Sequence, residues 1–484
     1  MLFMKRNTNK PFFTIIGGIF LGIIVVVFVL SLVLPDRTFS EKENRVLSSF
    51  PSFNLKQMAA GREEAKYETY VNDQFMLRDA WITLKAAADI CLGKVENNGV
   101  WLCSDGYLME NFTEPDEERL NELVTSINDF GDRDGDLPIY MMVVPNAVDI
   151  LSYRLPAGAQ VADQDRYIDD LKASVSEHNI SFIDLRDTLK SHNNERIYYK
   201  TDHHWTTMAA YYAYREAADT LKLDPSIISY EQLPVSNSFQ GTLSAKSGFR
   251  SGEEEEMFVF LPKADTAPEY VVSYVTERVK TASCYHPERL ETRDKYALFF
   301  DGNHAKVTVT NPSAEDRTIL VLKDSYANCF LPFLIPHFRE IVIIDPRYFF
   351  GDVDELIASM EIDEVLLLYN ANTFFSDTSL PLLLNEKDMS DEMRQRLKEM
   401  REERESAPEQ MIETDPVGDA VIDEAEEYES YDYSSGEEYN YDSDYDYDNE
   451  YDSDYDSGTD YGYDEDYDYS DGYDYDEDSE YDDF

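Results

Sequence analysis

The sequence predicts an α/β fold in which helices cover both faces of a mostly parallel sheet. Compact apolar runs, typical of buried strands, alternate with segments of helical periodicity. This order favours parallel pairing, because parallel strands need long crossovers and crossovers are usually helices. The 484-residue chain is 43% hydrophobic, so it can bury a sizeable core, and its length suggests two or three structural units.

Elements of this sheet can be assigned in order along an α/β domain at 96–384. The expected strands are Leu137–Pro145, Ile180–Leu185, 317–325, 339–346 and 363–370. The expected helices are 116–130, 165–179, 206–222, 326–338 and 352–362. Between them, the stretch from about 223 to 315 is rich in short β-like segments such as "EMFVFLP" and is interpreted as a β-rich insertion.

An N-terminal apolar segment is expected to be a transmembrane anchor. Residues 12–34 are almost wholly apolar, and about 20 such residues at about 1.5 Å rise each cross a bilayer core. A cleavable signal peptide is the alternative, but "LSLVLPDRTF" offers no clean small-x-small cleavage site. Because Lys5, Arg6 and Lys10 precede the segment, the positive-inside rule places 1–11 in the cytoplasm and the chain from Pro35 outside it. The expected location is the cell membrane, with a single pass.

Composition divides the remainder of the chain. Residues 35–95 are expected to form a juxtamembrane helical region, and 385–422 a charged helical linker. Residues 423–484 contain 29 acidic residues, 16 tyrosines and no Lys or Arg, so we expect a disordered acidic tail. Weak binding of divalent cations or of basic wall components is the alternative role for this tail. The net charge of -57 argues against a nucleic-acid partner, since phosphates would be repelled.

The four cysteines do not define a disulfide scaffold or a zinc site. A pairing of Cys91 with Cys103 stays open, and none of the four shows Cys-x-x-Cys spacing.

The loop "YYKTDHHWTT", residues 198–207, has three interpretations. A metal site is disfavoured, because the adjacent Asp202, His203 and His204 are not expected to point one way and the other histidines are scattered. A polar loop that caps a helix explains Thr206 as the N-cap, but it leaves Asp202 and His204 unexplained. The third interpretation is half of a hydrolytic site.

The segment "LVLKDSYANCF", residues 320–330, supplies the other half. It places Ser325 at the carboxyl end of an expected parallel strand, where open α/β sheets hold their sites. A serine hydroxyl needs a neutral His to take its proton and an acid to orient that His. His204 and Asp202 are of the right types, and a following helix would offer backbone N–H groups for an oxyanion.

With these two motifs the chain resembles the DHHW family, and through it the SGNH-like proteins of alginate O-acetylation. Further segments that resemble this family are "SEKENRVLSSFP", "YETYVNDQFMLRD", "YMMVVPNAVDIL", "NSFQGTLSAKSGF" and "IVIIDPRYF". The resemblance extends from about Ser40 to about Asp377. The resemblance implies an SGNH-hydrolase-like three-layer sandwich. It also implies Ser325 as nucleophile, His204 as general base and Asp202 as its orienting acid, with Trp205 in packing and no role for His203.

The chain departs from ordinary SGNH esterases in three ways. Lys323 stands where those enzymes have Gly, the Asp-x-His pair precedes the serine by about 120 residues, and Gly-x-Asn-Asp is missing. Oxyanion donors are therefore expected from the backbone N–H groups of Ser325 and Tyr326, with a side-chain amide from Asn370 or Asn372. Arg347 is a candidate for an anionic sugar or phosphate, with a surface ion pair as the alternative.

The expected function is a membrane-anchored, extracytoplasmic serine acyltransferase or esterase that acts on the O-acetyl groups of a carbohydrate polymer. No cofactor or metal is expected. The resemblance implies a multi-span membrane acyltransferase as the acetyl donor. Two alternatives stay open: a non-catalytic carbohydrate-binding protein, and a structural surface protein whose acidic tail is the working part.

Overall fold

The computed structural model describes residues 10–33, 35–40, 45–51, 64–133, 135–249 and 255–385. The predicted cytoplasmic N-terminus, except for Lys10 and Pro11, lies outside these ranges. The charged linker, apart from Asn385, and the acidic tail at 423–484 lie outside them too.

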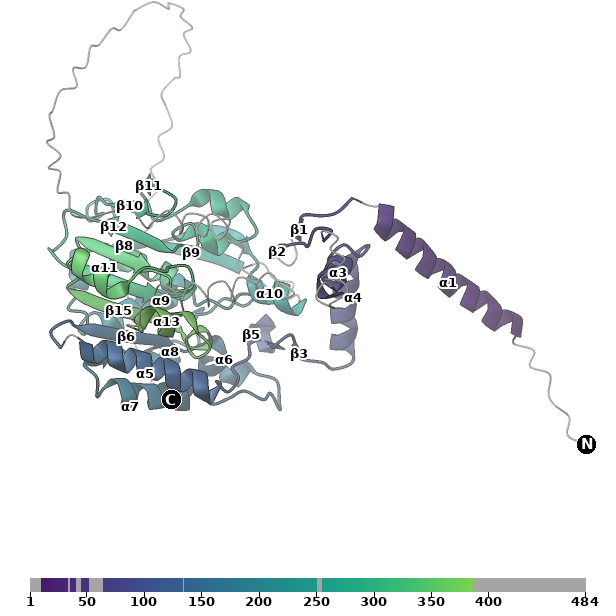
Figure 1. Ribbon diagram of the computed structural model, residues 1–484, viewed down its shortest axis with the longest axis horizontal. Helices are drawn as coiled ribbons and strands as arrows, with labels where there is room; N and C mark the ends of the chain where they lie inside the picture. Colours follow the sequence, from purple (N-terminus) through teal and green to yellow (C-terminus); the bar gives the residue numbers. More distant parts are fainter. Residues whose placement is uncertain are drawn as a thin grey trace, which may run out of the picture. The chain divides into compact units, whose positions relative to one another are not determined.

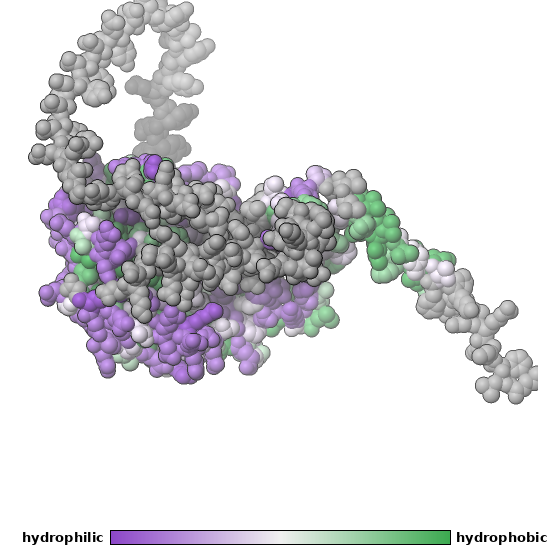
Figure 2. Space-filling view, viewed as in Figure 1, coloured by the Kyte–Doolittle hydropathy of each residue, from purple (hydrophilic) through white to green (hydrophobic). Residues whose placement is uncertain are grey.

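Helix α1 (Lys10–Val33) coincides with the predicted anchor. Its segment Thr14–Ser31 has a mean hydropathy of 2.8 and no residue buried by the rest of the chain, so by length and composition it could cross a membrane. Its apolar surface appears green in Figure 2.

The central sheet has eight strands in the order β11-β10-β12-β14-β13-β15-β6-β7 (Figure 1). Five are mutually parallel: β14 (Glu340–Ile344), β13 (Thr318–Lys323), β15 (Glu364–Asn370), β6 (Ile139–Val144) and β7 (Ile180–Phe182). All five lie within the predicted strand segments. The other three pair antiparallel: β12 (Lys306–Thr310), β10 (Val271–Tyr274) and β11 (Val279–Thr281). The sheet is therefore mixed, and the prediction of a mostly parallel sheet is not confirmed.

The residues at 223–315 do not form one separate insertion. The strands β8 (Tyr230–Phe239) and β9 (Glu255–Pro262) pair only with each other, whereas β10, β11 and β12 extend the central sheet. An antiparallel strand needs no helical crossover, so the sequence pattern used to recognise the parallel strands does not reveal it.

Helices pack around the central sheet, and one short helix, at 242–247, packs instead against the small sheet at 96–110. They are α5 (Glu117–Arg133), α6 (Ala147–Ile150), α7 (Gln164–Val175), α8 (Arg186–Ser191), α9 (Thr207–Ala217), α10 (Thr242–Ser247), α11 (Val353–Ser359), α12 (Ala371–Phe374) and α13 (Ser379–Leu384). The 3₁₀ turns are η1 (Ser104–Gly106), η2 (Ser152–Arg154), η3 (Pro225–Ile227), η4 (Pro287–Glu291), η5 (Lys295–Leu298), η6 (Ser325–Cys329) and η7 (Leu331–Phe333). Towards the N-terminus lie β1 (Phe39–Ser40), β2 (Arg45–Val46), α3 (Glu64–Asp73), α4 (Arg78–Cys91), β3 (Glu96–Asn97), β4 (Val100–Leu102) and β5 (Leu108–Glu110).

One predicted helix is wrong. Residues 326–338 form the two 3₁₀ turns η6 and η7 and no α-helix. The physical reason is Pro332, which has no N–H to donate and whose ring clashes with the preceding turn of an α-helix. By contrast, the predicted N-cap is confirmed, because Thr206 Oγ1 accepts from the N–H of Ala209 at the start of α9.

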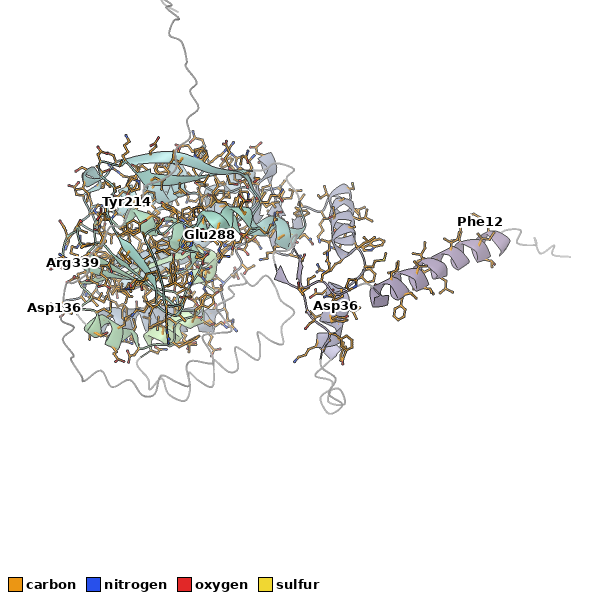
Figure 3. All side chains as sticks on the ribbon, turned by 90° about the horizontal axis from the view of Figure 1, so that it is seen from above. Phe12, Asp36, Asp136, Tyr214, Glu288 and Arg339 are labelled. Atoms are coloured by element: carbon orange, nitrogen blue, oxygen red, sulfur yellow. The ribbon has the colours of Figure 1, made fainter. Side chains whose placement is uncertain are left out.

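The core is continuous from the parallel strands through the helices, and side chains fill the space between them (Figure 3). Every residue of β6 and of β15 is buried, as expected of strands covered on both faces. Tyr214, labelled in Figure 3, is buried on α9, where its hydroxyl bonds His337 Nε2 at 2.8 Å. All four cysteines are free thiols, so the pairing of Cys91 with Cys103 is absent.

Leu366→Ala should destabilise the protein strongly, because Leu366 is 0% exposed at the centre of the sheet and its loss leaves a cavity. We expect the free energy of unfolding in urea to fall by about 2–5 kcal/mol. The matched control is Val279→Ala on the edge strand β11, where Val279 is 49% exposed and a change within about 0.5 kcal/mol is expected. Equal losses in the two variants would contradict the assigned core.

Candidate active site

The candidate site lies at the carboxyl edge of the parallel strands. Ser325 comes two residues after β13, Asn370 ends β15, and Asn146 comes two residues after β6. Because these strands are parallel neighbours, their carboxyl ends meet at one edge of the sheet. The loop that carries Asp202 and His204 reaches the same edge, closed by a bridge between Tyr198 and Trp205.

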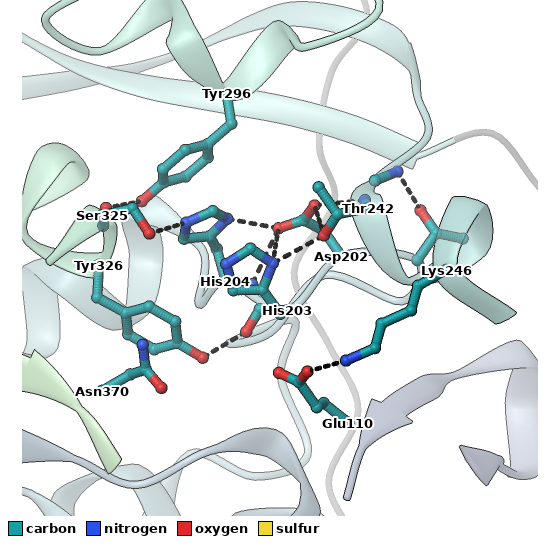
Figure 4. A network of polar contacts seen from close by, with 12 residues as sticks. Glu110, Asp202, His203, His204, Thr242, Lys246, Tyr296, Ser325, Tyr326 and Asn370 are labelled. Atoms are coloured by element: carbon teal, nitrogen blue, oxygen red, sulfur yellow. Dashed lines mark hydrogen bonds and ion pairs between the residues drawn. The ribbon is translucent and has the colours of Figure 1, made fainter. Parts of the chain in front are cut away.

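Three predicted residues meet in a continuous hydrogen-bonded chain (Figure 4). Ser325 Oγ lies 2.8 Å from His204 Nε2, and His204 Nδ1 lies 2.5 Å from Asp202 Oδ1. When Nδ1 carries the ring proton, it donates to Asp202 and leaves Nε2 to accept from the Ser325 hydroxyl. These hydrogen-bonded side chains are almost closed to solvent, since Ser325 is 5% and His204 1% exposed. An arrangement of this kind is able to activate a serine hydroxyl as a nucleophile.

Asp202 is held as a carboxylate from several sides. Its Oδ1 accepts from the His204 backbone N–H at 2.9 Å, and its Oδ2 accepts from the N–H and hydroxyl of Thr242 at 2.8 and 3.1 Å. Burial by itself would raise the pKa of Asp202, but the rings of His204 and His203 and these hydrogen bonds lower it well below its usual range. The carboxylate therefore stays charged and keeps the His204 ring oriented.

Gly241 makes this approach possible. A Cβ placed on Gly241 would lie 2.1 Å from Asp202 Cβ and 2.3 Å from Asp202 Oδ2, closer than atoms can pack. The glycine belongs to the segment "NSFQGT", whose only signal in the sequence is its resemblance to the DHHW family.

Aromatic rings enclose the histidine. The Tyr296 ring stacks on His204 with centroids 3.7 Å apart and planes inclined by 12°, and its hydroxyl donates to the Ser325 carbonyl at 3.2 Å. Sequence reasoning missed Tyr296, because it lies in the 223–315 stretch and carries no local motif. Trp205 is fully buried against Tyr326, as the packing role implied, and its Nε1–H donates to the Tyr326 carbonyl at 2.9 Å.

Asp324 organises the turn that presents the serine. Its Oδ1 accepts from the Tyr326 N–H at 2.9 Å, and its Oδ2 accepts from the backbone and side-chain amides of Asn370 at 2.8 and 2.6 Å. The second hydrogen of the Asn370 amide points to Thr373 Oγ1 at 2.7 Å. Two of the predicted oxyanion donors, Tyr326 and Asn370, thus bond Asp324. In addition, Ser325 opens a short 3₁₀ turn and no α-helix, so the predicted contribution of a helix N-terminus is wrong.

The other predicted polar residues lie around this turn. Asn372 donates its backbone N–H to Asn146 Oδ1 at 2.8 Å and its side-chain amide to Glu110 Oε2 at 3.3 Å. Arg347 binds the buried Asp345 through Nε and Nη2 at 2.9 and 2.6 Å, which is the ion-pair alternative considered for it.

Lys323, the residue in place of Gly, is buried beneath the turn. Its Nζ donates to Asn303 and Asn328 at 2.7 and 2.9 Å and lies 3.5 Å from Asp345. Lys323 therefore links the end of β13 to Asn303, Asn328 and Asp345.

The expectation that the adjacent Asp202, His203 and His204 do not point one way is wrong. One donor atom each of Asp202, His203 and His204 lies within 4.8 Å of the others, so adjacent residues do converge here. Both ring nitrogens of His204 are nevertheless engaged, one by Asp202 and one by Ser325. His203 Nδ1 bonds Thr242 Oγ1 at 2.7 Å. These contacts fit a proton-transfer chain better than a ligand set.

Gly241→Ala should uncouple Asp202 from His204, because the added methyl group overlaps the Asp202 side chain. We expect the rate at which phenylmethylsulfonyl fluoride modifies Ser325 to fall by roughly 10²-fold, the effect of an ångström-scale misplacement. Gly135→Ala is the control, since a Cβ there meets no atom within 4 Å. An unchanged labelling rate in Gly241→Ala would contradict the assigned role of the loop.

Asp324→Asn tests the charge beneath the serine. Burial raises the pKa of Asp324 to about 6 from 3.8, although bonds from Asn370 and Tyr326 and the charge of Arg347 oppose this. A raised pKa means that the folded state holds the proton more tightly. The stabilisation from this group is therefore complete below about pH 4 and lost as pH rises through about 6.

The Asp324→Asn variant has no such titration, so its free energy of unfolding relative to the wild type should rise by about 3 kcal/mol between about pH 4 and pH 7. Urea unfolding at several pH values measures this difference. A fall over the same range would show that the three N–H donors hold the pKa low instead.

Comparisons with known proteins identify relatives of the part of the chain that contains this site. Residues 111–344 match the model of the DHHW protein family. A solved DHHW family protein from Eubacterium siraeum is 23% identical, covering 59% of this chain and 95% of that chain, with a TM-score of 0.51. This likeness supports the fold. No curated protein matches the chain.

Two further solved structures are more distant. PatB1 of Bacillus cereus, solved with a sulfonyl adduct, is 22% identical over 58% of this chain and 97% of that chain, with a TM-score of 0.49. The O-acetyltransferase domain of Pseudomonas putida AlgJ is 13% identical over 60% of this chain and all of its own, 100%, with a TM-score of 0.37. The resemblance to the DHHW family is thus confirmed over residues 111–344, the segment that contains Asp202, His204 and Ser325.

Proposed function

We propose that the protein is a serine acyltransferase or esterase that acts on the O-acetyl groups of a carbohydrate polymer outside the cytoplasm. The observation that carries the proposal is the chain from Ser325 Oγ through His204 to Asp202, at 2.8 and 2.5 Å. The acetyl group and the carbohydrate follow from the resemblance to the DHHW family and, through it, to alginate O-acetylation proteins. The proposed scaffold is the SGNH-hydrolase-like three-layer sandwich.

In the first step, His204 Nε2 takes the Ser325 proton while Oγ attacks the acetyl carbonyl carbon of the donor ester. Asp202 stabilises the imidazolium that forms. The tetrahedral intermediate collapses as the donor C–O bond breaks, and His204 returns the proton to the leaving oxygen. The product is acetyl-serine at position 325. In the second step a sugar hydroxyl or water gives its proton to His204 and attacks this ester, which restores the Ser325 hydroxyl.

The developing oxyanion needs a donor at the start of η6. We assign the backbone N–H of Ser325 to this role. Tyr326 and Asn370 act, in this proposal, through Asp324, because their amide groups already donate to its carboxylate. The stack of Tyr296 on His204 keeps the imidazole plane aligned with Ser325 and excludes water from the ring face.

Helix α1 would anchor this domain as a single membrane pass, with the site on the outer side. A donor based on acetyl-CoA would then be on the opposite side. A multi-span membrane acyltransferase that passes the acetyl group across is the proposed partner. The alternative of a non-catalytic binding protein requires a serine beyond reach of His204, whereas the two side chains are in hydrogen-bond contact.

Ser325→Ala should abolish acetyl-ester turnover by the full-length protein in detergent. We expect the rate of p-nitrophenyl acetate hydrolysis to fall by at least roughly 10³-fold, and acetyl-serine to disappear from the intact mass spectrum, because the nucleophile is gone. Ser176→Ala, at an exposed serine on the C-cap of α7, is the control and should keep the wild-type rate. Undiminished turnover in Ser325→Ala, with an unchanged unfolding curve, would refute the assignment.

A further inference from the structure

A cavity of about 290 Å³ lies at the same edge of the sheet as Ser325. Its walls come from the end of β5, the following loop, the start of α5, and α12 with the residues after it. The lining residues used below are Glu110, Phe112, Asp116, Arg119, Asn372 and Ser376. A volume of this size accommodates one sugar ring of a longer chain.

Glu110 joins this cavity to the triad. Its Oε1 accepts from Lys246 Nζ at 2.6 Å, and Lys246 lies on α10, whose first residue, Thr242, bonds Asp202. Its Oε2 accepts from the Asn372 amide at 3.3 Å. Figure 4 shows Glu110 and Lys246 beside His203, next to the triad. Burial would raise the pKa of Glu110, but Lys246, His203 and these hydrogen bonds lower it, so the carboxylate is ionised at neutral pH.

A second link runs through the turn that carries the serine. Asn372 donates its backbone N–H to Asn146 Oδ1, and the Asn146 amide donates to the Tyr326 hydroxyl at 3.3 Å. Tyr326 is the residue after Ser325. The cavity wall and the serine turn therefore share one hydrogen-bond network.

The lining suits a hydroxylated ligand. Glu110 offers carboxylate oxygens, Asn372 an amide and Ser376 a hydroxyl. Phe112 and Phe375, both buried and packed edge-on at 5.9 Å, form the apolar floor of the cavity. A few convergent hydrogen-bonding groups above an apolar floor are the usual composition of a small-molecule site.

The charges of the lining select among sugars. Glu110 is paired with Lys246, so the carboxylates of Glu114 and Asp116 stand against the single guanidinium of Arg119 and leave the lining net negative. A uronate or phosphate group entering this cavity would face net repulsion at short range, whereas an amino group would be attracted. The only cation considered for an anionic sugar, Arg347, is engaged by the buried Asp345.

We propose that this cavity binds the acceptor sugar of the transfer reaction, and that this sugar is uncharged or amino-substituted. The inference rests on the proposed function and extends it. Glu110 and Asn372 determine specificity by holding the sugar through its hydroxyl groups. One hydroxyl then gives its proton to His204, its oxygen forms the new ester bond to the acetyl carbon, the Ser325 Oγ–C bond breaks, and the proton passes from His204 to Oγ.

The experiment measures how acetyl-serine partitions between sugar and water. Full-length protein turns over p-nitrophenyl acetate in the presence of a chitin, a glucosamine or a galacturonate oligosaccharide, and mass spectrometry counts acetylated sugar against released acetate. We expect transfer to the first two and little to galacturonate. Glu110→Gln and Asn372→Ala should lower the transfer-to-hydrolysis ratio by about 10-fold, the effect of losing a hydrogen bond to a charged or buried group. Glu177→Gln, at an exposed glutamate, should leave it unchanged.

A further variant keeps the proposal testable if Glu110→Gln or Asn372→Ala fails to fold. Asp116→Asn preserves a side chain that can cap α5, where Asp116 Oδ1 accepts from the Arg119 N–H, but it removes one negative charge from the lining. It should raise transfer to galacturonate relative to chitin oligosaccharide. Preference for galacturonate in the wild type, or an unchanged ratio in Glu110→Gln and Asn372→Ala, would overturn the proposal.

Binding to the Ser325→Ala protein tests the cavity without turnover. Calorimetric titration should show the chitin oligosaccharide binding more weakly, by about 10-fold, when Glu110→Gln is added. If the wild type releases no p-nitrophenolate, the proposed function fails, whereas this titration still decides the cavity. Equal affinity in the single and double variants, or the absence of binding to Ser325→Ala, would overturn the assigned acceptor site.

Discussion

The buried carboxylate of Asp324 is the constraint on which the site depends. It accepts three N–H groups, from Tyr326 beside the serine and from the backbone and side chain of Asn370 at the end of the neighbouring strand. Hydrogen bonds to a carboxylate are roughly twice as strong as neutral ones, and a buried donor left without a partner is costly. Asp324 therefore ties the ends of β13 and β15 together and sets the direction in which Ser325 leaves the sheet.

The histidine half of the site is built on the opposite side by independent means. Asp202 is anchored by Thr242 and accommodated by Gly241, and His204 is clamped between Asp202, Ser325 and the ring of Tyr296. The two halves meet through the contact of Ser325 Oγ with His204 Nε2 and through the Trp205 Nε1–H, which donates to the Tyr326 carbonyl. Under the proposed function, these hydrogen bonds hold the groups in place before charge develops, so little reorganisation is required.

The residues of the triad and the side chains beside them differ in their exposure to solvent. Ser325 and His204 are almost fully enclosed, while His203, Glu110 and Lys246 beside them are partly exposed. The surface next to the triad is thus polar, and in the adjoining cavity carboxylates outnumber cations. Under the proposed function, a chain with a net charge of -57 and such a cavity would repel a polyanionic acceptor. The resemblance to alginate O-acetylation proteins therefore does not imply a uronate substrate here.

The sequence by itself determined the parallel strands, the N-cap at Thr206 and the identity of the three residues that meet in the triad. These features have local signals: uninterrupted apolar runs, a hydroxyl before a helical period, and reactive residue types at a strand end. It indicated short β-like segments at 223–315, but it did not reveal that β10, β11 and β12 extend the central sheet in antiparallel order, because the partners of a strand are set by the fold. It also misjudged 326–338, where hydrophobic spacing suggested a helix and Pro332 prevented one.

Only the tertiary structure decided how the remaining polar residues are used. Tyr326 and Asn370 were expected to face an oxyanion, but they bond Asp324, because a buried carboxylate takes the nearest donors. Tyr296 entered the site from a segment with no motif, and Gly241 proved necessary for a contact with Asp202, about 40 residues earlier in the chain. Contacts between residues so far apart leave no periodic trace in a single sequence. They are set by which strand ends the sheet brings together, and that is a property of the fold.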